Sequence, residues 1–155
     1  MANENGLKVI LACDACAFDF KEKVLAGLRE LGHDVADAGC YSCSKGYYVD
    51  AAEAVCNGVK SAQYDRGVLI CGSGQGMNIV ANKFSGIRST ICYDHLEAKL
   101  SRADNNTNVL CTGAWFMSAD DCIKMIDIWL ISDYYETNNV YGLQKIAQFE
   151  QAMKS

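Results

Sequence analysis

Residues 68–84, VLICGSGQGMNIVANKF, join an apolar run, three alternating glycines and a segment with helical spacing. An apolar run that ends in a glycine-rich turn before a helix is typical of a buried strand in a parallel α/β fold. The strand-like part ends at Cys71. From these residues alone, Cys71 is either a reactive thiol at the turn or the last buried residue of the strand, and both interpretations stay open.

Strand-like runs and amphipathic helical segments alternate on both sides of this stretch. We expect strands at 7–13, 33–39, 66–71, 87–92 and 107–111, and helices at 18–31, 50–62, 76–84, 95–102 and over most of the C-terminal third. This alternation predicts a parallel sheet covered by helices on both faces. The carboxyl ends of all strands then share one edge of the sheet, where ligands of such folds bind.

The 155 residues are expected to form one domain, since half of them are apolar and about a fifth are charged. The net charge of −5 argues against a nucleic-acid partner. No stretch reaches the roughly 18 apolar residues that a membrane span needs, and the N-terminal MANENGLK lacks the plan of a secretory signal. We therefore expect a cytoplasmic protein without a membrane partner.

Nine cysteines raise the question of disulfides, metal ligands or buried thiols. The pairs Cys13/Cys16 and Cys40/Cys43 have the spacing of zinc ligands and could form a four-thiolate site. An odd cysteine count without a signal favours reduced thiols, and the first cysteine of each pair ends an apolar run. We therefore expect buried thiols rather than a metal site.

The glycine turn has the chemistry of an anion-binding loop. Gly72, Gly74 and Gly76 can bring backbone N–H groups close to a ligand, although their spacing matches neither nucleotide-binding fingerprint. Cys71 at the start of the following helix is expected to have a lowered pKa and to act as a base or nucleophile. The other polar groups expected at this edge are Asp14, Ser73, Asp94 and His95.

Two segments, LICGSGQGMNIVANKFSGIRSTICYD (69–94) and AKLSRADNNTNVLCTGAWF (98–116), closely resemble the RpiB/LacA/LacB family of sugar-phosphate isomerases. The likeness covers about residues 7–131, and only the last helix matches poorly. It implies a flavodoxin-like three-layer sandwich whose five parallel strands have the order 2-1-3-4-5. It also implies a homodimer or homotetramer with active sites shared between subunits, so the C-terminal helix, about 138–153, is expected to pack on a partner subunit.

The resemblance implies an aldose–ketose isomerase that works without a metal or an organic cofactor. Cys71 occupies the place of the family cysteine that moves a proton between C1 and C2 of the open-chain sugar, with Ser73 beside it. Asn105 matches the asparagine that faces the developing anion, and Asp14 matches the acidic residue that contacts sugar hydroxyls. The loop residues implied to bind the anion are Gly72, Gly74, Gln75 and Gly76.

The chain departs from the family at the residues that hold phosphate and open the sugar ring. Ala15 replaces a histidine that helps to hold phosphate, and Trp115 replaces an arginine after the fifth strand. Asp104 replaces the ring-opening histidine and is our candidate for its role. The arginines of the C-terminal helix fall near Asn139 and Leu143.

These departures leave the substrate open. His95 could supply a missing acid or phosphate contact, and the other possible phosphate donors are Lys45, Lys83, Arg88, Arg102 and Lys145. A four-carbon ketose phosphate cannot close a furanose ring, so it would need no ring-opening histidine. The alternatives are an unphosphorylated sugar or sugar acid as substrate, and a non-catalytic binding or partner subunit of this fold.

Overall fold

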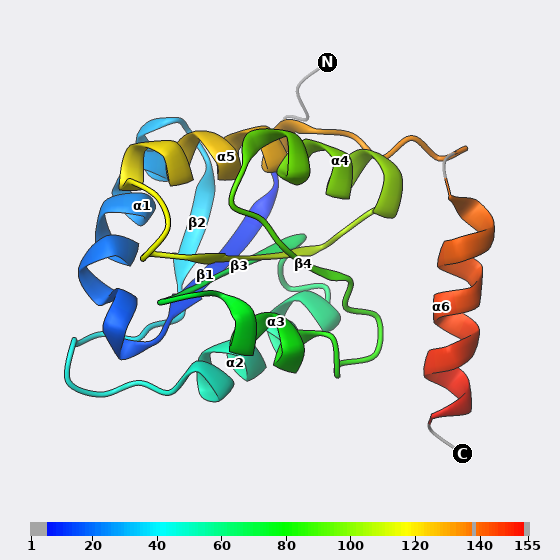
Figure 1. Cartoon of the computed structure of the whole chain (residues 1–155), viewed down its shortest axis with the longest axis horizontal. Coiled ribbons are helices and arrows are strands. Elements are labelled where there is room, and N and C mark those ends of the chain that lie inside the picture. Colours follow the sequence, from blue (N-terminus) through cyan, green and yellow to red (C-terminus); the bar gives the residue numbers. More distant parts are fainter. Residues whose placement is uncertain (1–5, 138, 154–155) are drawn as a thin grey trace.

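A computed structural model describes residues 6–137 and 139–153 (Figure 1). Residues 1–5 of the N-terminal stretch, residue 138 at the expected start of the last helix, and residues 154–155 lie outside the described residues. The strands are β1 (Lys8–Cys13), β2 (Asp34–Asp37), β3 (Arg66–Cys71), β4 (Ser89–Ile91) and β5 (Val109–Gly113). The helices are the 3-10 turn η1 (Ala15–Ala17), α1 (Phe18–Glu30), α2 (Tyr48–Lys60), α3 (Gln75–Ala81), α4 (His95–Asn105), α5 (Ala119–Ile131) and α6 (Val140–Ala152).

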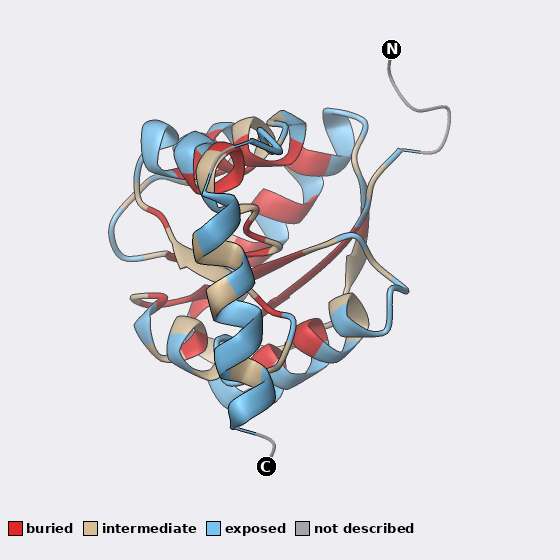
Figure 2. Ribbon diagram, turned by 90° about the vertical axis from the view of Figure 1, so that its right-hand side faces the viewer, coloured by how far each residue is buried: buried red, intermediate tan, exposed pale blue. Residues whose placement is uncertain are grey.

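All five strands are parallel, and helices cover both faces of the sheet, which confirms the predicted fold class (Figure 1). Successive residues of β3 point to opposite faces. Val68 and Ile70 pack with α1, α4 and α5, whereas Leu69 and Cys71 pack with α2 and α3. Buried residues accordingly follow the sheet and the inner faces of these helices (Figure 2).

The predicted strand order 2-1-3-4-5 is wrong at its last two positions. The sheet has the order β2-β1-β3-β5-β4, so β5 lies between β3 and β4. All five residues of β5 are buried, as a central strand requires, whereas the three residues of β4 are only half-buried at the edge. The register pairs Cys71 with Gly113. The chain that follows β5, rather than β4, therefore runs beside Cys71.

Helix α4 extends three residues beyond the expected 95–102. It begins at the cap residue Asp94, whose side chain accepts the N–H groups of Leu96 and Glu97, and it ends before Asn106 in the left-handed conformation. Asp104 and Asn105 are therefore the last residues of this helix. Since α4 runs back from the carboxyl ends of the strands, both lie at the opposite edge of the sheet from Cys71.

Helix α6 stands apart from the three layers (Figure 1). None of its described residues is buried, and Ile146, Phe149 and Met153 leave a cavity of about 400 Å³ between it and the region around β4 and the end of α4. Glu150 bridges to the body by accepting the Gly86 N–H at 3.0 Å. That this helix packs on a partner subunit stays a prediction.

Within the described ranges, every helix is too short or too polar to cross a membrane.

Candidate active site

Cys71 ends β3 with its thiol turned toward α2 and α3 and almost fully buried. The Gly74 N–H donates to its Sγ at 2.9 Å. Gly74 has a φ of +82°, and a Cβ there would lie 2.9 Å from the backbone of Thr112 on β5. Only glycine fits this turn, because it needs both the left-handed conformation and close contact with the neighbouring strand.

The pKa of the Cys71 thiol is raised, contrary to the lowering expected at this turn. Burial is the largest cause and disfavours the thiolate. The Gly74 N–H lowers the pKa, the negative charge of Asp14 raises it, and the N–H and hydroxyl groups of Ser73 lower it. The loop donors therefore act in the expected direction, but burial outweighs them and favours the neutral thiol.

Asp14 lies beside Cys71 because β1 neighbours β3 in the sheet. Its N–H donates to Ile70 O, and its side chain accepts the Ala17 N–H at 3.3 Å at the start of η1. The Cys16 thiol donates to the same carboxylate oxygen at 3.0 Å. The structure thus brings together the carboxylate and the thiol that the sequence analysis placed at one edge.

Ser73 lies in the loop that follows Cys71, and Gln75 and Gly76 are the first two residues of α3. Tyr93, which is not among the predicted site residues, connects this loop to the end of β4. Its hydroxyl donates to Ser73 O at 2.6 Å and accepts from Gln75 Nε2 at 3.0 Å. In the sequence, Tyr93 could be found as a residue with a hydrogen-bonding hydroxyl at the carboxyl end of a strand. Its neighbour Asp94, which was predicted at this edge, caps α4 with its side chain.

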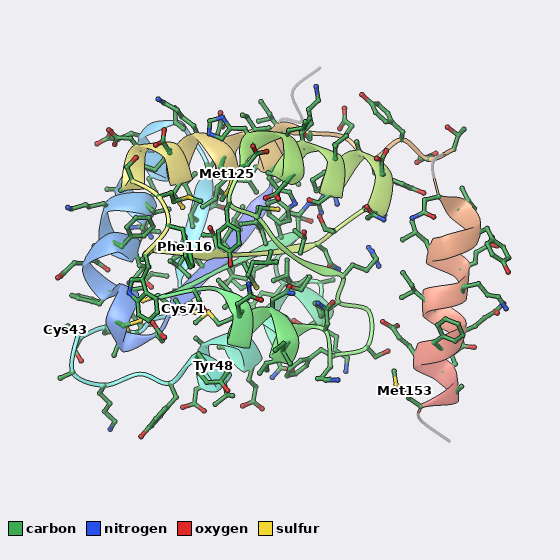
Figure 3. All side chains as sticks on the ribbon, in the orientation of Figure 1. Cys43, Tyr48, Cys71, Phe116, Met125 and Met153 are labelled. Atoms are coloured by element: carbon green, nitrogen blue, oxygen red, sulfur yellow. The ribbon has the colours of Figure 1, made fainter. Side chains whose placement is uncertain are left out.

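Aromatic side chains surround the glycine loop. The Trp115 indole lies against Gly72 and the Tyr48 ring lies against Gly76. Phe116 packs edge-to-face on Tyr93, with ring centroids 5.1 Å apart. Cys71, Phe116 and Tyr48 lie on the same side of the molecule in Figure 3, and Met153 of the C-terminal helix lies on the other.

The structure does not bring every predicted site residue to this loop. Asp104 and Asn105 lie at the opposite edge of the sheet, and Asn105 lines the cavity beneath α6. His95 begins α4 at the correct edge, but its Nε2 faces Asp121 O of α5 at 3.4 Å. Of the predicted site residues, those next to Cys71 in a single chain are therefore Asp14 and the residues of the glycine turn.

The possible phosphate donors have different surroundings. Arg102 is buried and donates to Asn106 and Thr107, and Arg88 donates to Asn106 O, so both hold the chain between α4 and β5. Lys83 lies in the turn after α3, and Lys145 lies on α6; both are away from Cys71. Lys45 is exposed on the loop before α2, next to Gly46, whose carbonyl accepts the Ala15 N–H.

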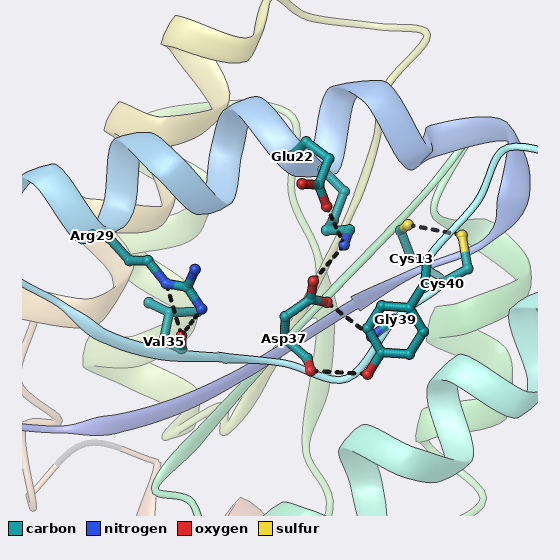
Figure 4. A network of polar contacts seen from close by, with 9 residues as sticks. Cys13, Glu22, Arg29, Val35, Asp37, Gly39 and Cys40 are labelled. Carbon is teal, nitrogen blue, oxygen red and sulfur yellow. Dashed lines mark hydrogen bonds and ion pairs between the residues drawn. The ribbon is translucent and has the colours of Figure 1, made fainter.

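The four cysteines of the candidate zinc site do not converge. Cys13 Sγ lies 3.4 Å from Cys40 Sγ (Figure 4), whereas Cys16 contacts Asp14 and Cys43 is exposed. Burial raises the pKa of Cys13 well above its ordinary value, which favours a neutral thiol there. Across residues 6–137 and 139–153, no three His, Cys, Asp or Glu side chains are grouped so that they could hold a metal ion.

Comparison with known proteins gives consistent matches over nearly the whole chain. The chain is 35% identical over 144 residues to "Ribose-5-phosphate isomerase B" of Escherichia coli strain K12, covering 93% of this chain and 97% of that one. It is 30% identical over 149 residues to "D-erythrulose-4-phosphate isomerase" of Pectobacterium atrosepticum, covering 96% and 98%. Among solved structures, ribose-5-phosphate isomerase B of Clostridium thermocellum matches with a TM-score of 0.91 and 30% identity, covering 95% of this chain and 99% of that one.

The profile of one protein family, described as Ribose/Galactose Isomerase, matches residues 9–146. This range contains all of the sheet except Lys8, the first residue of β1, together with the Cys71 turn. The chain belongs to the ribose/galactose isomerase family of enzymes.

Proposed function

We propose that this chain interconverts a small aldose phosphate and the corresponding ketose phosphate, with Cys71 carrying the proton between C2 and C1. The observation that carries the proposal is the position of the Cys71 thiol, at the carboxyl end of a central strand and 2.9 Å from the Gly74 N–H. Ligands of open α/β sheets bind at this edge. Membership in a sugar-isomerase family supports the reaction class.

The proposed reaction needs one base that reaches both carbons. The Cys71 thiolate accepts the proton from C2 of the open-chain aldose, and the electron pair of that bond forms a double bond between C1 and C2. The carbonyl oxygen becomes an enediolate oxygen. The thiol then returns the proton to C1, and the hydroxyl proton on O2 moves to O1 as the ketone forms. The sugar gains and loses no atoms, so the steps consume no oxidant or reductant.

Charge on the enediolate oxygens requires donors that are already in place. The candidate donors are the Ser73 hydroxyl and the backbone N–H groups from Gly72 to Gly76. One of these groups, the Gly74 N–H, already points to the reacting group, because it donates to the Cys71 thiol. Asp14 accepts hydrogen bonds from sugar hydroxyls, because a carboxylate is an acceptor only. Tyr93 holds the loop in place, because its hydroxyl donates to Ser73 O.

A four-carbon sugar phosphate is our preferred substrate over a pentose phosphate. Asp104 stands where the family has its ring-opening histidine, and a four-carbon sugar with a phosphate on C4 cannot close a furanose ring. One relative from Pectobacterium atrosepticum is named for such a substrate. Lys45, exposed on the loop before α2, is our candidate for the phosphate contact.

The proposed active unit is at least a homodimer in which each site takes residues from two copies of the chain. Asp104 and Asn105 lie at the far edge of their own sheet, so a second copy must supply them to Cys71. The exposed apolar residues of α6, among them Ile146 and Phe149, are then covered by that copy. Burial of such residues contributes about 25 cal/mol per Å² of apolar surface.

An unphosphorylated sugar or sugar acid is the second candidate substrate. The observation that favours it is Trp115, which packs on Gly72 where an arginine would serve a phosphate. Ala15 likewise offers no charged group. The ratio of kcat/KM for erythrose 4-phosphate and erythrose separates the two candidates.

Turnover of erythrose 4-phosphate, ribose 5-phosphate and erythrose tests these assignments. We expect the wild type to favour erythrose 4-phosphate, and Cys71→Ser to lose about 10² to 10⁴ in kcat, the contribution of one positioned base. Cys43→Ser, at an exposed thiol, is the matched control. Good turnover of ribose 5-phosphate with none of the tetrose phosphate would contradict the four-carbon assignment, and no turnover of any sugar would indicate a non-catalytic subunit.

A further inference from the structure

Trp115 has a fixed position beside the reactive thiol. The pairing of β3 and β5 continues beyond both strands, because the Ala114 N–H donates to Cys71 O at 2.8 Å and the Trp115 N–H donates to Gly72 O at 3.1 Å. The Phe116 N–H then turns back to Gly113 O. The backbone of Ala114 and Trp115 is therefore held to Cys71 and Gly72, at the start of the loop that carries the proposed chemistry.

The indole packs directly on the loop. A Cβ built on Gly72 would lie 2.4 Å from Cζ2 of Trp115 and 2.5 Å from its Cε2, so the six-membered ring covers the Gly72 Cα. Yet 71% of the residue's surface remains exposed. One side of the ring system thus contacts the loop, and most of the indole remains exposed at the carboxyl edge of the sheet, where ligands of such folds bind.

The chemistry of the indole limits what it can bind. It carries no charge and has one N–H donor, so it cannot hold a phosphate as an arginine does. A flat apolar ring does fit the C–H groups of a sugar chain. Trp115 therefore matches the carbon backbone of a substrate rather than its anionic end.

The opposite end of the loop has a second aromatic boundary. A Cβ on Gly76 would lie 2.8 Å from the Tyr48 ring, and Tyr48 begins α2. The segment Gly72–Gly76, which ends in the first turn of α3, is thus bounded by Trp115 at one end and Tyr48 at the other. A sugar that lies over the loop with C1 and C2 at Cys71 has a limited length between these rings.

We propose that Trp115 selects substrates by chain length, so that the site accepts four-carbon sugars and rejects those with five carbons. The inference rests on the proposed isomerase function. It adds the residue that enforces the choice: the indole occupies the space that the additional carbon and its hydroxyl would need. Removing this side chain opens that space without touching Cys71, Asp14 or the loop backbone.

The ratio of kcat/KM for erythrose 4-phosphate and ribose 5-phosphate tests the proposal. One carbon unit in a fitted site changes this ratio by about 10- to 200-fold, so we expect Trp115→Ala to lower the ratio by at least about tenfold. Trp115→Phe keeps a flat ring and should keep most of the preference. Tyr135→Ala removes an exposed aromatic side chain of the α5–α6 connection and should leave the ratio unchanged.

The outcomes separate this inference from the proposed function. If Cys71→Ser abolishes turnover but Trp115→Ala leaves the ratio at its wild-type value, the selection by Trp115 is wrong and the isomerase function stands. If the wild type turns over neither sugar, the proposed function fails. Trp115 is largely exposed, and a far-ultraviolet circular dichroism spectrum of Trp115→Ala should match the wild type, so that lost activity reflects the site.

Tryptophan fluorescence gives a readout that does not depend on turnover. The chain has two tryptophans, Trp115 and Trp129. Trp129 of α5 is fully buried, and its indole N–H donates to the Thr107 hydroxyl. Erythronate 4-phosphate carries a carboxylate that resembles the enediolate. We expect it to change the emission of the wild type and not that of Trp115→Phe. An equal change in both proteins would overturn the placement of the sugar against Trp115.

Discussion

Two opposing effects set the pKa of Cys71. Burial favours the thiol, and the hydrogen-bond donors of the glycine turn favour the thiolate. Burial dominates, so the pKa of Cys71 lies above its ordinary value of 9.0. The glycine turn and the start of the following helix predict the opposite sign. How completely α2 and α3 cover the thiol depends on packing between distant segments, which local sequence patterns do not record.

The raised pKa predicts how activity depends on pH. Proton abstraction needs the thiolate, and below the raised pKa its fraction increases about tenfold per pH unit. We therefore expect kcat/KM to rise steadily between about pH 7 and about pH 9. Initial rates with erythrose 4-phosphate across this range check it. A plateau already reached below pH 7 would show that the free enzyme holds a thiolate.

At the scale of elements, an ion pair between α1 and β2 is linked by hydrogen bonds to the end of β1, next to Asp14 (Figure 4). Lys21 is fully buried, and its Nζ lies 2.6 Å from Glu22 and 2.8 Å from Asp37. Asp37 also accepts the Gly39 N–H, and Gly39 O accepts the Cys13 N–H just before Asp14. Burial alone would lower the pKa of Lys21, but Asp37 and Glu22 raise it.

Removing this charge should destabilise the fold. Breaking a fully buried pair costs about 3 to 5 kcal/mol, and we expect about 2 to 3 kcal/mol for Lys21→Met because Asp37 and Glu22 keep contact with water. Urea unfolding of the variant measures the change. Lys60→Met, at an exposed lysine ending α2, should change the free energy of unfolding by less than about 0.5 kcal/mol. Equal effects of the two substitutions would rule out a special role for the pair.

Local patterns predicted the elements better than their arrangement. The strand at 66–71 was predicted with its observed ends, because an apolar run between a charged residue and a glycine turn defines both. The order of β4 and β5 was wrong, since periodicity does not record which strand a crossover places next to which. With the wrong strand order, Trp115 is not expected near Cys71, because their proximity depends on the pairing of β5 with β3.

At the scale of the whole molecule, one chain carries two parts of the candidate site at opposite edges of its sheet. Cys71 and Asp14 lie at the carboxyl ends of the strands, and Asn105 lies at the other edge beside α6. The sequence resemblance implied that a partner supplies the second part. An isologous dimer uses the same surface twice, so one contact would complete two sites.

Mixing two inactive variants tests whether sites are shared. In a mixed dimer of Cys71→Ser and Asn105→Ala chains, one site contains both substituted residues and the other contains neither. Random pairing of equal amounts should therefore restore about a quarter of the wild-type activity. Co-expression with two affinity tags isolates the mixed dimers. Mixed dimers no more active than their parents would place each complete site within one chain.

The most direct test of the central claim is the entry of solvent hydrogen into the sugar at C1 and C2. In deuterium oxide, the wild type should place deuterium at C1 of the ketose and C2 of the aldose, because the Cys71 thiol exchanges with solvent between the two transfers. Cys71→Ser should lose this incorporation by about 10² to 10⁴, while Cys43→Ser should retain it. Incorporation by Cys71→Ser at the wild-type rate would contradict the role of Cys71 as the base.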